Sequence, residues 1–369
     1  EYRLEELFDL QMGKTPSRSV TEYWESGNNK WISIADLSKC GKYIYDTKEC
    51  LSDIAVPESG IKQIPANTVV MSFKLSIGKT AITSEPMYSN EAIMSFRDRK
   101  LVQLLPEYIY YLLLSKNWDD GTNKAVMGKT LNKATLSKVK VNIHSMQEQQ
   151  EIVYVLNQAT ALIELHQQQL QKLDELVKAR FVELFGDPIS NPHGFDKVDL
   201  SELADIKIGP FGSLLHKGDY IEGGYALLNP SHIIDGKIAP DSELTVSREK
   251  YEELSAYHLK AGDVVMGRRG EMGRCAVVPC DGYLCGTGSL LIRTKGDVTA
   301  DYIQKIISFP SFKKAIEDMA VGQTMPNLNV PIVSRFQIIK PPIEVQHSYY
   351  AFVEQTDKSK LLQFFCFPI

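Results

Sequence analysis

The chain has 369 residues, of which 43% are hydrophobic and 24% are charged, and its formal net charge is −5. This length and apolar content are enough to bury about two to three domain cores, whereas the acidic balance argues against a surface covered with phosphate-binding residues. No apolar run approaches the ~20 residues of a membrane span and no charged-then-apolar leader is present, so we expect a soluble cytoplasmic protein.

The first segment, residues 1–146, has the pattern of a mixed α/β domain. Apolar runs rich in β-branched and aromatic residues predict short strands at 30–34 and 68–73. A helix is expected over 106–118, because this segment opens with a proline, which is tolerated at the first helical position. The glycine-marked stretch 128–130 then predicts a loop.

Residues 147–185 predict one long helix that packs along another helix. Apolar residues recur at every seventh position, and a second series fills the other seam position of the heptad. The first series is Leu156, Ile163, Leu170, Val177 and Leu184, and the second is Ile152, Ala159, His166 and Leu173. About 38 residues at ~1.5 Å each predict a rod of roughly 57 Å. A linker helix buried against its own domains is the alternative.

Residues 186–341 predict a second mixed α/β domain. Strands are expected at 276–278 and 336–339, and a helix over 300–319. Glycine and proline are dense at 209–213 and 322–327, which therefore predict loops.

A distal helix is predicted in the segment 342–369, beginning after Gln346. Residues 345–360 continue this helix, but 361–369 form an apolar, aromatic tail without a helical period, so we expect a truncated or altered ending. Such an ending would leave the C-terminal half of the central apolar stripe uncovered, which predicts self-association through the helices.

The two α/β segments repeat each other. A shift of about 195 positions aligns residues 64–79 with 259–274 without a gap, and a period this long indicates a duplicated domain. The framework residues agree, but positions 74–76 are Lys-Leu-Ser whereas 269–271 are Arg-Gly-Glu. One scaffold with two loop chemistries predicts two recognition units for two different signals.

The order of elements in each copy resembles a known family. A strand and basic turn at 264–273 are followed by the glycine-rich loop at 322–327 and by Pro-Pro-Ile-Glu-Val-Gln at 341–346, which leads into a helix. The first copy repeats this order with 128–130 and 145–150. This arrangement resembles the specificity (S) subunit of Type I restriction-modification systems, and the resemblance covers nearly the whole chain.

The resemblance implies an α/β fold with two duplicated target recognition domains, separated by long coiled-coil-forming helices and related by a pseudo-two-fold axis. It implies a non-catalytic subunit that reads a bipartite, asymmetric site in double-stranded DNA. The helices would set the spacing and dock two methyltransferase (M) subunits, which use S-adenosylmethionine, and restriction (R) subunits would add cleavage. The chain itself would then hold no cofactor.

No pattern of residues indicates an active site. The chain lacks the Asn-Pro-Pro-aromatic stretch of an amino-methylating enzyme and any glycine-rich loop suited to S-adenosylmethionine. Its six cysteines include no Cys-x-x-Cys pair, so we expect ordinary thiols and no metal. We therefore predict that the chain is not an enzyme on its own.

Candidate DNA contacts are the polar residues of the basic turns, of the loops and of the segment after residue 228. Arg can bind guanine through O6 and N7, and either Arg or Lys can neutralise a phosphate. The candidates are Lys74, Lys79, Lys129, Thr130, Asn229, Ser231, His232, Arg268, Arg269, Arg274, Gln323, Thr324 and Asn327. The candidate partner contacts of the helix are Leu156, Ile163, Leu170, Leu173, Val177 and Leu184. Each DNA candidate could equally be a solvated loop residue.

Two other functions fit the same pattern. A coiled-coil scaffold could use the duplicated domains to bind proteins without DNA specificity, and a fused restriction-methylation enzyme could contain such a recognition fragment. Binding to random duplexes with a steep salt dependence would separate DNA binding from a protein scaffold.

Overall fold

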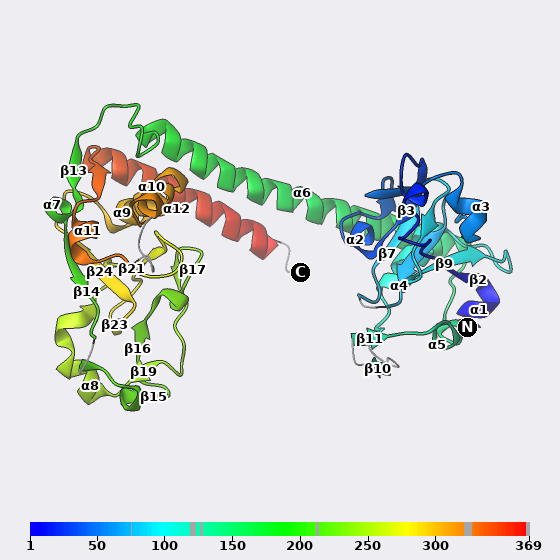
Figure 1. Cartoon of the computed structure of the whole chain (residues 1–369), viewed down its shortest axis with the longest axis horizontal. Helices are drawn as coiled ribbons and strands as arrows, with labels where there is room; N and C mark the ends of the chain where they lie inside the picture. The colour runs from blue at the N-terminus through cyan, green and yellow to red at the C-terminus, as the bar shows by residue number, and fades with distance from the viewer. Residues whose placement is uncertain (75, 119–122, 126–127, 212–213, 321–326, 367–369) are drawn as a thin grey trace. The chain divides into compact units, whose positions relative to one another are not determined.

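The chain forms two compact units, Glu1–Leu165 and His166–Ile369, in a computed structural model. The structure describes residues 1–74, 76–118, 123–125, 128–211, 214–320 and 327–366, with the backbone alone at 123–125, 128–130, 319–320 and 362–366. Each unit is a mixed α/β fold, which confirms the predicted fold class, and the long helix α6 (Met146–Phe185) contributes its first part to one unit and its last part to the other (Figure 1).

The first unit is built on a main sheet with the strand order β2-β9-β6-β7-β4 and a smaller sheet with the order β5-β3-β8. The strands of this unit are β1 (Tyr2–Arg3), β2 (Phe8–Met12), β3 (Asn29–Ile32), β4 (Tyr43–Ile44), β5 (Glu49–Leu51), β6 (Val69–Ser72), β7 (Thr80–Thr83), β8 (Tyr88–Ser89), β9 (Ile93–Asp98), β10 (Asn123–Ala125), β11 (Gly128–Thr130) and β12 (Lys140–Val141). The helices before α6 are α1 (Leu4–Leu7), α2 (Ile34–Leu37), α3 (Ala55–Ser59), α4 (Pro106–Leu114) and α5 (Lys133–Ser137).

The second unit repeats this topology. Its four-stranded sheet β14-β24-β21-β22 corresponds to β2-β9-β6-β7. Within its five-stranded sheet β15-β19-β16-β23-β20, the strands β19-β16-β23 correspond to β5-β3-β8, including the parallel pair. The strands are β13 (Lys197–Asp199), β14 (Ala204–Ile208), β15 (Tyr220–Ile221), β16 (Tyr225–Leu228), β17 (Ile233–Ile234), β18 (Lys237–Ile238), β19 (Thr245–Val246), β20 (His258–Leu259), β21 (Val264–Gly267), β22 (Cys275–Val277), β23 (Tyr283–Cys285), β24 (Ser289–Thr294) and β25 (Gln337–Ile339). The helices are α7 (Leu200–Leu203), α8 (Arg248–Glu253), α9 (Ala300–Ile307), α10 (Pro310–Ala320), α11 (Val330–Ser334) and α12 (Ile343–Cys366).

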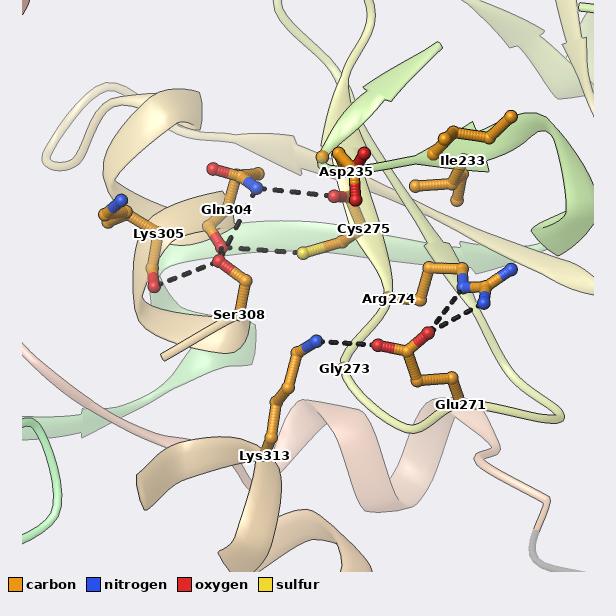
Figure 2. Close-up of a pocket in the computed structure, with 12 residues that line it drawn as sticks. Ile233, Asp235, Glu271, Gly273, Arg274, Cys275, Gln304, Lys305, Ser308 and Lys313 are labelled. Carbon is orange, nitrogen blue, oxygen red and sulfur yellow. Dashed lines mark hydrogen bonds and ion pairs between the residues drawn. The ribbon is translucent and has the colours of Figure 1, made fainter. Parts of the chain in front are cut away.

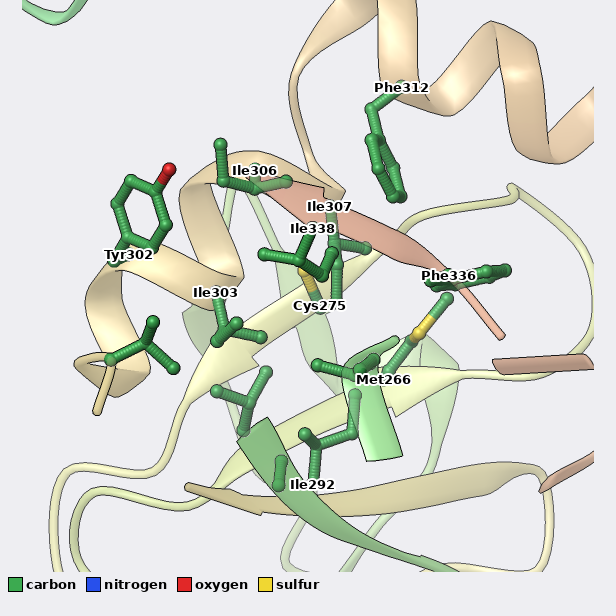
Figure 3. Packing of buried hydrophobic residues seen from close by; sticks show 14 of the residues in the cluster. Met266, Cys275, Ile292, Tyr302, Ile303, Ile306, Ile307, Phe312, Phe336 and Ile338 are labelled. Atoms are coloured by element: carbon green, nitrogen blue, oxygen red, sulfur yellow. The ribbon is translucent and has the colours of Figure 1, made fainter. Parts of the chain in front are cut away.

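An inner strand of each main sheet is a continuous apolar run because it is buried on both faces. In β21, Val264 and Met266 belong to one core cluster and Val265 belongs to another. Figure 3 shows the larger cluster, which also contains Ile303 of α9 and Ile338 of β25. Burying each of these side chains stabilises the fold by about 1.5–3 kcal/mol, so the strand that leads into the basic turn is a fixed support.

Two helical segments differ from the sequence prediction. The helix expected over 300–319 is divided into α9 and α10, because Pro310 has no N–H to donate and disfavours a helical residue before it. The tail predicted to be non-helical continues α12 as far as Cys366, since no Gly or Pro occurs in this helix to end it earlier.

The second half of α6 is covered by α12, contrary to the expectation of an open stripe there. The two helices run antiparallel: Tyr349 packs on Phe181 and Phe185 with ring centroids 5.5 Å apart, and Lys360 pairs with Asp174 at 2.7 Å (Figure 1). The large exposed apolar residues of α6 lie mainly in its first half. In that half they are Tyr154, Val155, Leu156, Leu162, Ile163 and Leu165.

A buried glutamine fixes the start of each long helix to its unit. Gln149 of α6 accepts a hydrogen bond from Leu105 N, and Gln346 of α12 accepts one from Thr299 N, each at 3.0 Å. Both glutamines also donate to backbone carbonyls, and both side chains are fully buried. Leu105 and Thr299 precede α4 and α9, so each glutamine satisfies a helix start and ties the long helix to it.

Candidate nucleic-acid interface

One backbone hydrogen bond in each unit joins the basic turn to the residue that follows the predicted glycine-marked stretch; the stretch 128–130, predicted as a loop, forms β11. We define the first basic turn as residues 73–79 and the second basic turn as residues 267–274. Leu131 N donates to Phe73 O at 3.0 Å, and Leu328 N donates to Arg268 O at 2.9 Å. Leu131 directly follows β11 and Leu328 directly follows Asn327, so the chain just beyond each predicted loop lies beside its basic turn.

The segment after β16 joins the second basic turn. A Cβ on Gly267 would lie 3.1 Å from Pro230 Cβ, and Arg274 Nη1 donates to Pro230 O at 3.3 Å. Asn229 Oδ1 in turn accepts a hydrogen bond from Gly288 N at 3.4 Å. Candidates predicted from three separate stretches of sequence therefore meet at one place in the second unit.

The three arginines of the second basic turn have different environments. Arg268 is half-buried and donates from Nε to Leu328 O at 3.3 Å; burial, with a smaller effect from Arg269, lowers its pKa. Arg274 donates to Glu271 Oε2 from Nε at 3.1 Å and from Nη2 at 2.7 Å. Arg269 is exposed, and its side chain makes no hydrogen bond or ion pair within the part of the chain that the structure describes. Arg269 is thus the available cation of this turn.

His232 is buried, although the sequence analysis places it among the residues near base edges. It is 4% exposed, and its Nδ1 lies 2.8 Å from a backbone carbonyl oxygen and 3.2 Å from Asn229 N. His232 accepts a hydrogen bond from Asn229 N, as Asp36 accepts one from Ser33 N in the first unit, but only Ser33 also accepts a bond through its side chain, from Asp36 N. A buried imidazole held in this way cannot reach a base, so His232 supports the fold, whereas its neighbour Ser231 is exposed.

The loop candidates are only partly visible. Asn327 is half-buried, and its Oδ1 has no hydrogen-bond partner among the described residues. Gln323 and Thr324 lie outside the described residues. Lys129 and Thr130 are described by their backbone alone, as part of β11.

The first basic turn is held by an aromatic side chain. Gly78 has a positive φ of 88°, and a Cβ there would lie 2.9 Å from Trp118 Cδ1. Lys79 is exposed, and no side-chain partner for it occurs among the described residues, whereas Lys74 Nζ lies 5.3 Å from the centre of the Phe73 ring. In the first unit, Lys79 is therefore the available cation, as Arg269 is in the second.

The second basic turn is held by an ion cluster. A Cβ on Gly273 would lie 2.8 Å from Lys313 Cγ, and Lys313 Nζ pairs with Glu271 Oε1 at 2.9 Å. Figure 2 shows Glu271 between Lys313 and Arg274, beside a cavity of about 380 Å³. Hydrogen bonds from Lys313 and Arg274 lower the pKa of Glu271 to about 2. We call Glu271, Arg274 and Lys313 the Glu271 clamp. The sequence analysis named neither Lys313 nor the pairing of Glu271.

The predicted partner contacts of the helix divide between the units. Val177 and Leu184 pack against the core of the second unit. Leu156 and Ile163, in the first unit, have exposed fractions of 36% and 42%. The partly buried members are Leu170 and Leu173. Only the exposed pair presents a free apolar surface.

Other kinds of site find little support. Within the described ranges, no helix is long and apolar enough to cross a membrane, and no three His, Cys, Asp or Glu side chains gather where they could hold a metal ion. Burial raises the pKa of Cys275 and of Cys285 to about 12, so both thiols stay protonated at neutral pH.

Comparison with known proteins gives consistent matches. The Type I restriction modification DNA specificity domain matches residues 1–175 and again residues 192–363. The Type I restriction enzyme MjaIX specificity subunit of Methanocaldococcus jannaschii is 24% identical over 384 residues, which cover 95% of this chain and 85% of the relative. The EcoR124I/EcoR124II specificity subunit of Escherichia coli is 27% identical over 184 residues, which cover 45% of this chain and 44% of the relative.

Solved structures match over nearly the full length. A chain from a study of complex assembly and conformational transition of the type I R-M system superposes with a TM-score of 0.64 at 15% identity, covering 98% of this chain and 90% of that chain. The Type-I restriction-modification S subunit from M. genitalium superposes with a TM-score of 0.55 at 13% identity, covering 97% of this chain and 89% of that chain. At these identities the likeness establishes the fold.

Proposed function

Since this chain belongs to the family of Type I restriction-modification specificity subunits, we propose that it reads a bipartite, asymmetric DNA site, one half with each unit. A specificity subunit contributes DNA sequence recognition to its complex, whereas catalysis resides in partner subunits. One observation carries the proposal. In both units the same backbone bond joins the basic turn to the residue just after the predicted loop, yet each turn offers a different available cation, Lys79 or Arg269.

The two cations suit different contacts. The guanidinium of Arg269 is a planar fork that can bind guanine O6 and N7 together, whereas the Lys79 ammonium is a point charge that fits a phosphate or a single acceptor. Ser231 and Asn327 add polar groups beside the second turn. Two half-sites of different sequence are the expected result.

The long helices would set the gap between the half-sites and dock M subunits. The 40 residues of α6 correspond to about 60 Å at ~1.5 Å per residue. The exposed Leu156 and Ile163 support an apolar contact with a partner. An M subunit would bind S-adenosylmethionine and share the phosphate contacts that a chain of net charge −5 supplies poorly, and R subunits would add cleavage.

The test is selection of bound duplexes from a random pool by the chain assembled with its M subunits. Arg269→Ala should relax one half-site and leave the other intact, and Lys79→Ala should do the reverse. Loss of a bidentate arginine contact costs about 1–3 kcal/mol of discrimination at the affected position. Arg248→Ala in α8 and Lys62→Ala serve as controls, because both are exposed cations outside the turns.

The same selection separates the alternatives. If Arg269→Ala changed both half-sites equally, the units would not read independently. If the wild-type chain enriched no sequence and bound random duplexes without a salt dependence, a protein-interaction scaffold would be the better description.

A further inference from the structure

We infer that Glu271 limits how much positive charge the second unit presents to DNA, because it holds Arg274 and Lys313 within the protein. This inference rests on the proposed function and deepens it. It concerns the balance between sequence-specific and non-specific binding, since cations that contact phosphates strengthen binding to every sequence alike.

Glu271 accepts hydrogen bonds from both cations. Glu271 Oε2 accepts two hydrogen bonds from Arg274, at 3.1 and 2.7 Å, and Glu271 Oε1 accepts one from Lys313 Nζ at 2.9 Å. Arg274 also donates to Pro230 O at 3.3 Å. Figure 2 shows both cationic side chains directed at the one carboxylate. For either cation to turn fully to a phosphate, it would have to break its bonds to Glu271.

The aliphatic part of Lys313 is restrained as well. Its Cγ packs over Gly273, where a Cβ would lie only 2.8 Å away. Lys313 extends from α10, and the neighbouring Phe312 and Ile316 are buried in the core of the unit. The backbone of Lys313 is therefore held by the packing of α10, and its ammonium is held by Glu271.

Arg269 lies outside the Glu271 clamp. It belongs to the same turn, is exposed, and makes no side-chain hydrogen bond or ion pair within the described ranges. Arg268 is half-buried against Leu328 O. Of the four cations at this turn, one is thus exposed and unpaired among the described residues, while two share the single negative charge of Glu271.

The first unit has no such device at the equivalent positions. Position 76, which aligns with Glu271, is a serine. Trp118 covers Gly78 as Lys313 covers Gly273. The clamp is therefore a property of the second turn and is not required by the fold.

The expected consequence is measurable in the salt dependence of binding. Each phosphate neutralised by the protein adds about 0.9 to the magnitude of the slope of log K against log salt. Glu271→Gln replaces the carboxylate by a neutral side chain of the same size, and so removes the negative charge that holds the two cations. We expect random-sequence duplexes to bind more tightly, with a slope steeper by about 1 to 2.

The experiment measures binding of the full chain to a random-sequence duplex by fluorescence anisotropy over a series of salt concentrations. Glu252→Gln, in α8, is the matched control, because it removes one exposed negative charge from the same unit without releasing a cation. Glu271→Gln combined with Lys313→Gln should lose about half of the gain in slope. Equal slopes for Glu271→Gln and Glu252→Gln would overturn the inference.

A second measurement uses the wild-type chain and so does not depend on how the variants fold. Acetylation rates should be low for Lys313 and high for its exposed neighbour Lys314, and adding duplex should leave the Lys313 rate unchanged. Equal rates in the free chain, or protection of Lys313 by DNA, would contradict the inference. A wild-type chain that bound no duplex at all would instead remove the proposed function, and the inference with it.

Discussion

The two basic turns share a glycine with a positive φ but are held by different chemistry. Gly78 and Gly273 both have a positive φ, of 88° and 72°. A side chain packs over each glycine: Trp118, which follows α4, and Lys313, which belongs to α10. Trp118 covers the first turn with an indole, whereas Lys313 covers the second and pairs with Glu271. A duplicated fold can therefore keep a geometry while changing its physical basis, from apolar packing in one unit to ion pairing in the other.

The largest expected effect comes from a methyl group at the two glycines. Gly273→Ala should destabilise the second unit by about 3 kcal/mol, and Gly78→Ala the first unit by about 1–2 kcal/mol. The difference arises because the new methyl at 273 would meet Ile307 O, a backbone atom, at 2.9 Å, whereas the one at 78 meets only the Trp118 ring. Hydrogen exchange resolved by unit would measure both.

Two other glycines supply the controls for this comparison. Gly60 and Gly262 also have a positive φ, but a Cβ at either would meet nothing within 4 Å. Gly60→Ala and Gly262→Ala therefore report the cost of the backbone conformation alone. If Gly273→Ala cost no more than Gly262→Ala, close packing under Lys313 would be refuted.

Unlike the two basic turns, the two buried glutamines Gln149 and Gln346 should contribute equally to the stability of their units. Gln149→Leu removes the partner of one helix-start N–H and of two carbonyls, and Gln346→Leu removes the partner of one helix-start N–H and of one carbonyl. Each loss should cost about 2 kcal/mol. Gln158→Leu, on an exposed position of α6, is the control. Denaturant unfolding followed by unit-specific hydrogen exchange would test this, and a clear difference between the two losses would show that the glutamines are not equivalent.

Salt should loosen the second turn and leave the first unchanged. The Glu271 clamp is partly exposed, so we expect its stabilisation to be below about 1 kcal/mol and to decrease as the ionic strength rises. Packing of Trp118 on Gly78 has no such dependence. Exchange rates of the amides at 268–274 and at 76–79, compared between low and high salt, would reveal the contrast, and parallel changes would contradict it.

The smallest effect is the response to pH. Because Lys313 and Arg274 lower the pKa of Glu271 to about 2, the clamp is complete above the ordinary glutamate value. Its contribution declines as the pH falls below that value and is lost below about 2. An NMR titration of the Glu271 carboxyl carbon should have its midpoint near 2, and a midpoint in the usual glutamate range would mean that the ion pairs are not formed in solution.

Much of the fold could be predicted because it depends on local patterns. The strands at 68–73 and 264–267 were indicated by continuous apolar runs, and the central helix by its heptads. The division at Pro310 was equally readable from the chemistry of proline, although the predicted helix ran through it. The helical tail beyond residue 360 was missed because its apolar composition obscured the absence of any helix-ending residue.

The DNA-contact residues remain predictions, and the contacts that hold the basic turns could not be read from the sequence. The basic turns stand out in the sequence, yet the partner of Glu271 is 42 positions away, in another helix, and no local pattern reveals it. His232 was misplaced for another reason: it is buried and bonds to Leu227 O, five positions earlier, but no local pattern marks this histidine as buried. Which arginine is available is decided by such distant contacts and not by the turn itself.

The bond from Leu131 to Phe73, and its counterpart from Leu328 to Arg268, join main-chain atoms only. The side chains at the two acceptor positions, an aromatic ring and a guanidinium, have no chemistry in common. Natural selection can therefore replace residues here without disconnecting turn from loop, and so can a protein engineer. A library randomised at positions 231, 269 and 327 would sample new contact chemistry on a frame whose register the peptide backbone sets. The two units of this chain already differ in this way, since they keep the same main-chain bond but have different residues at the turn.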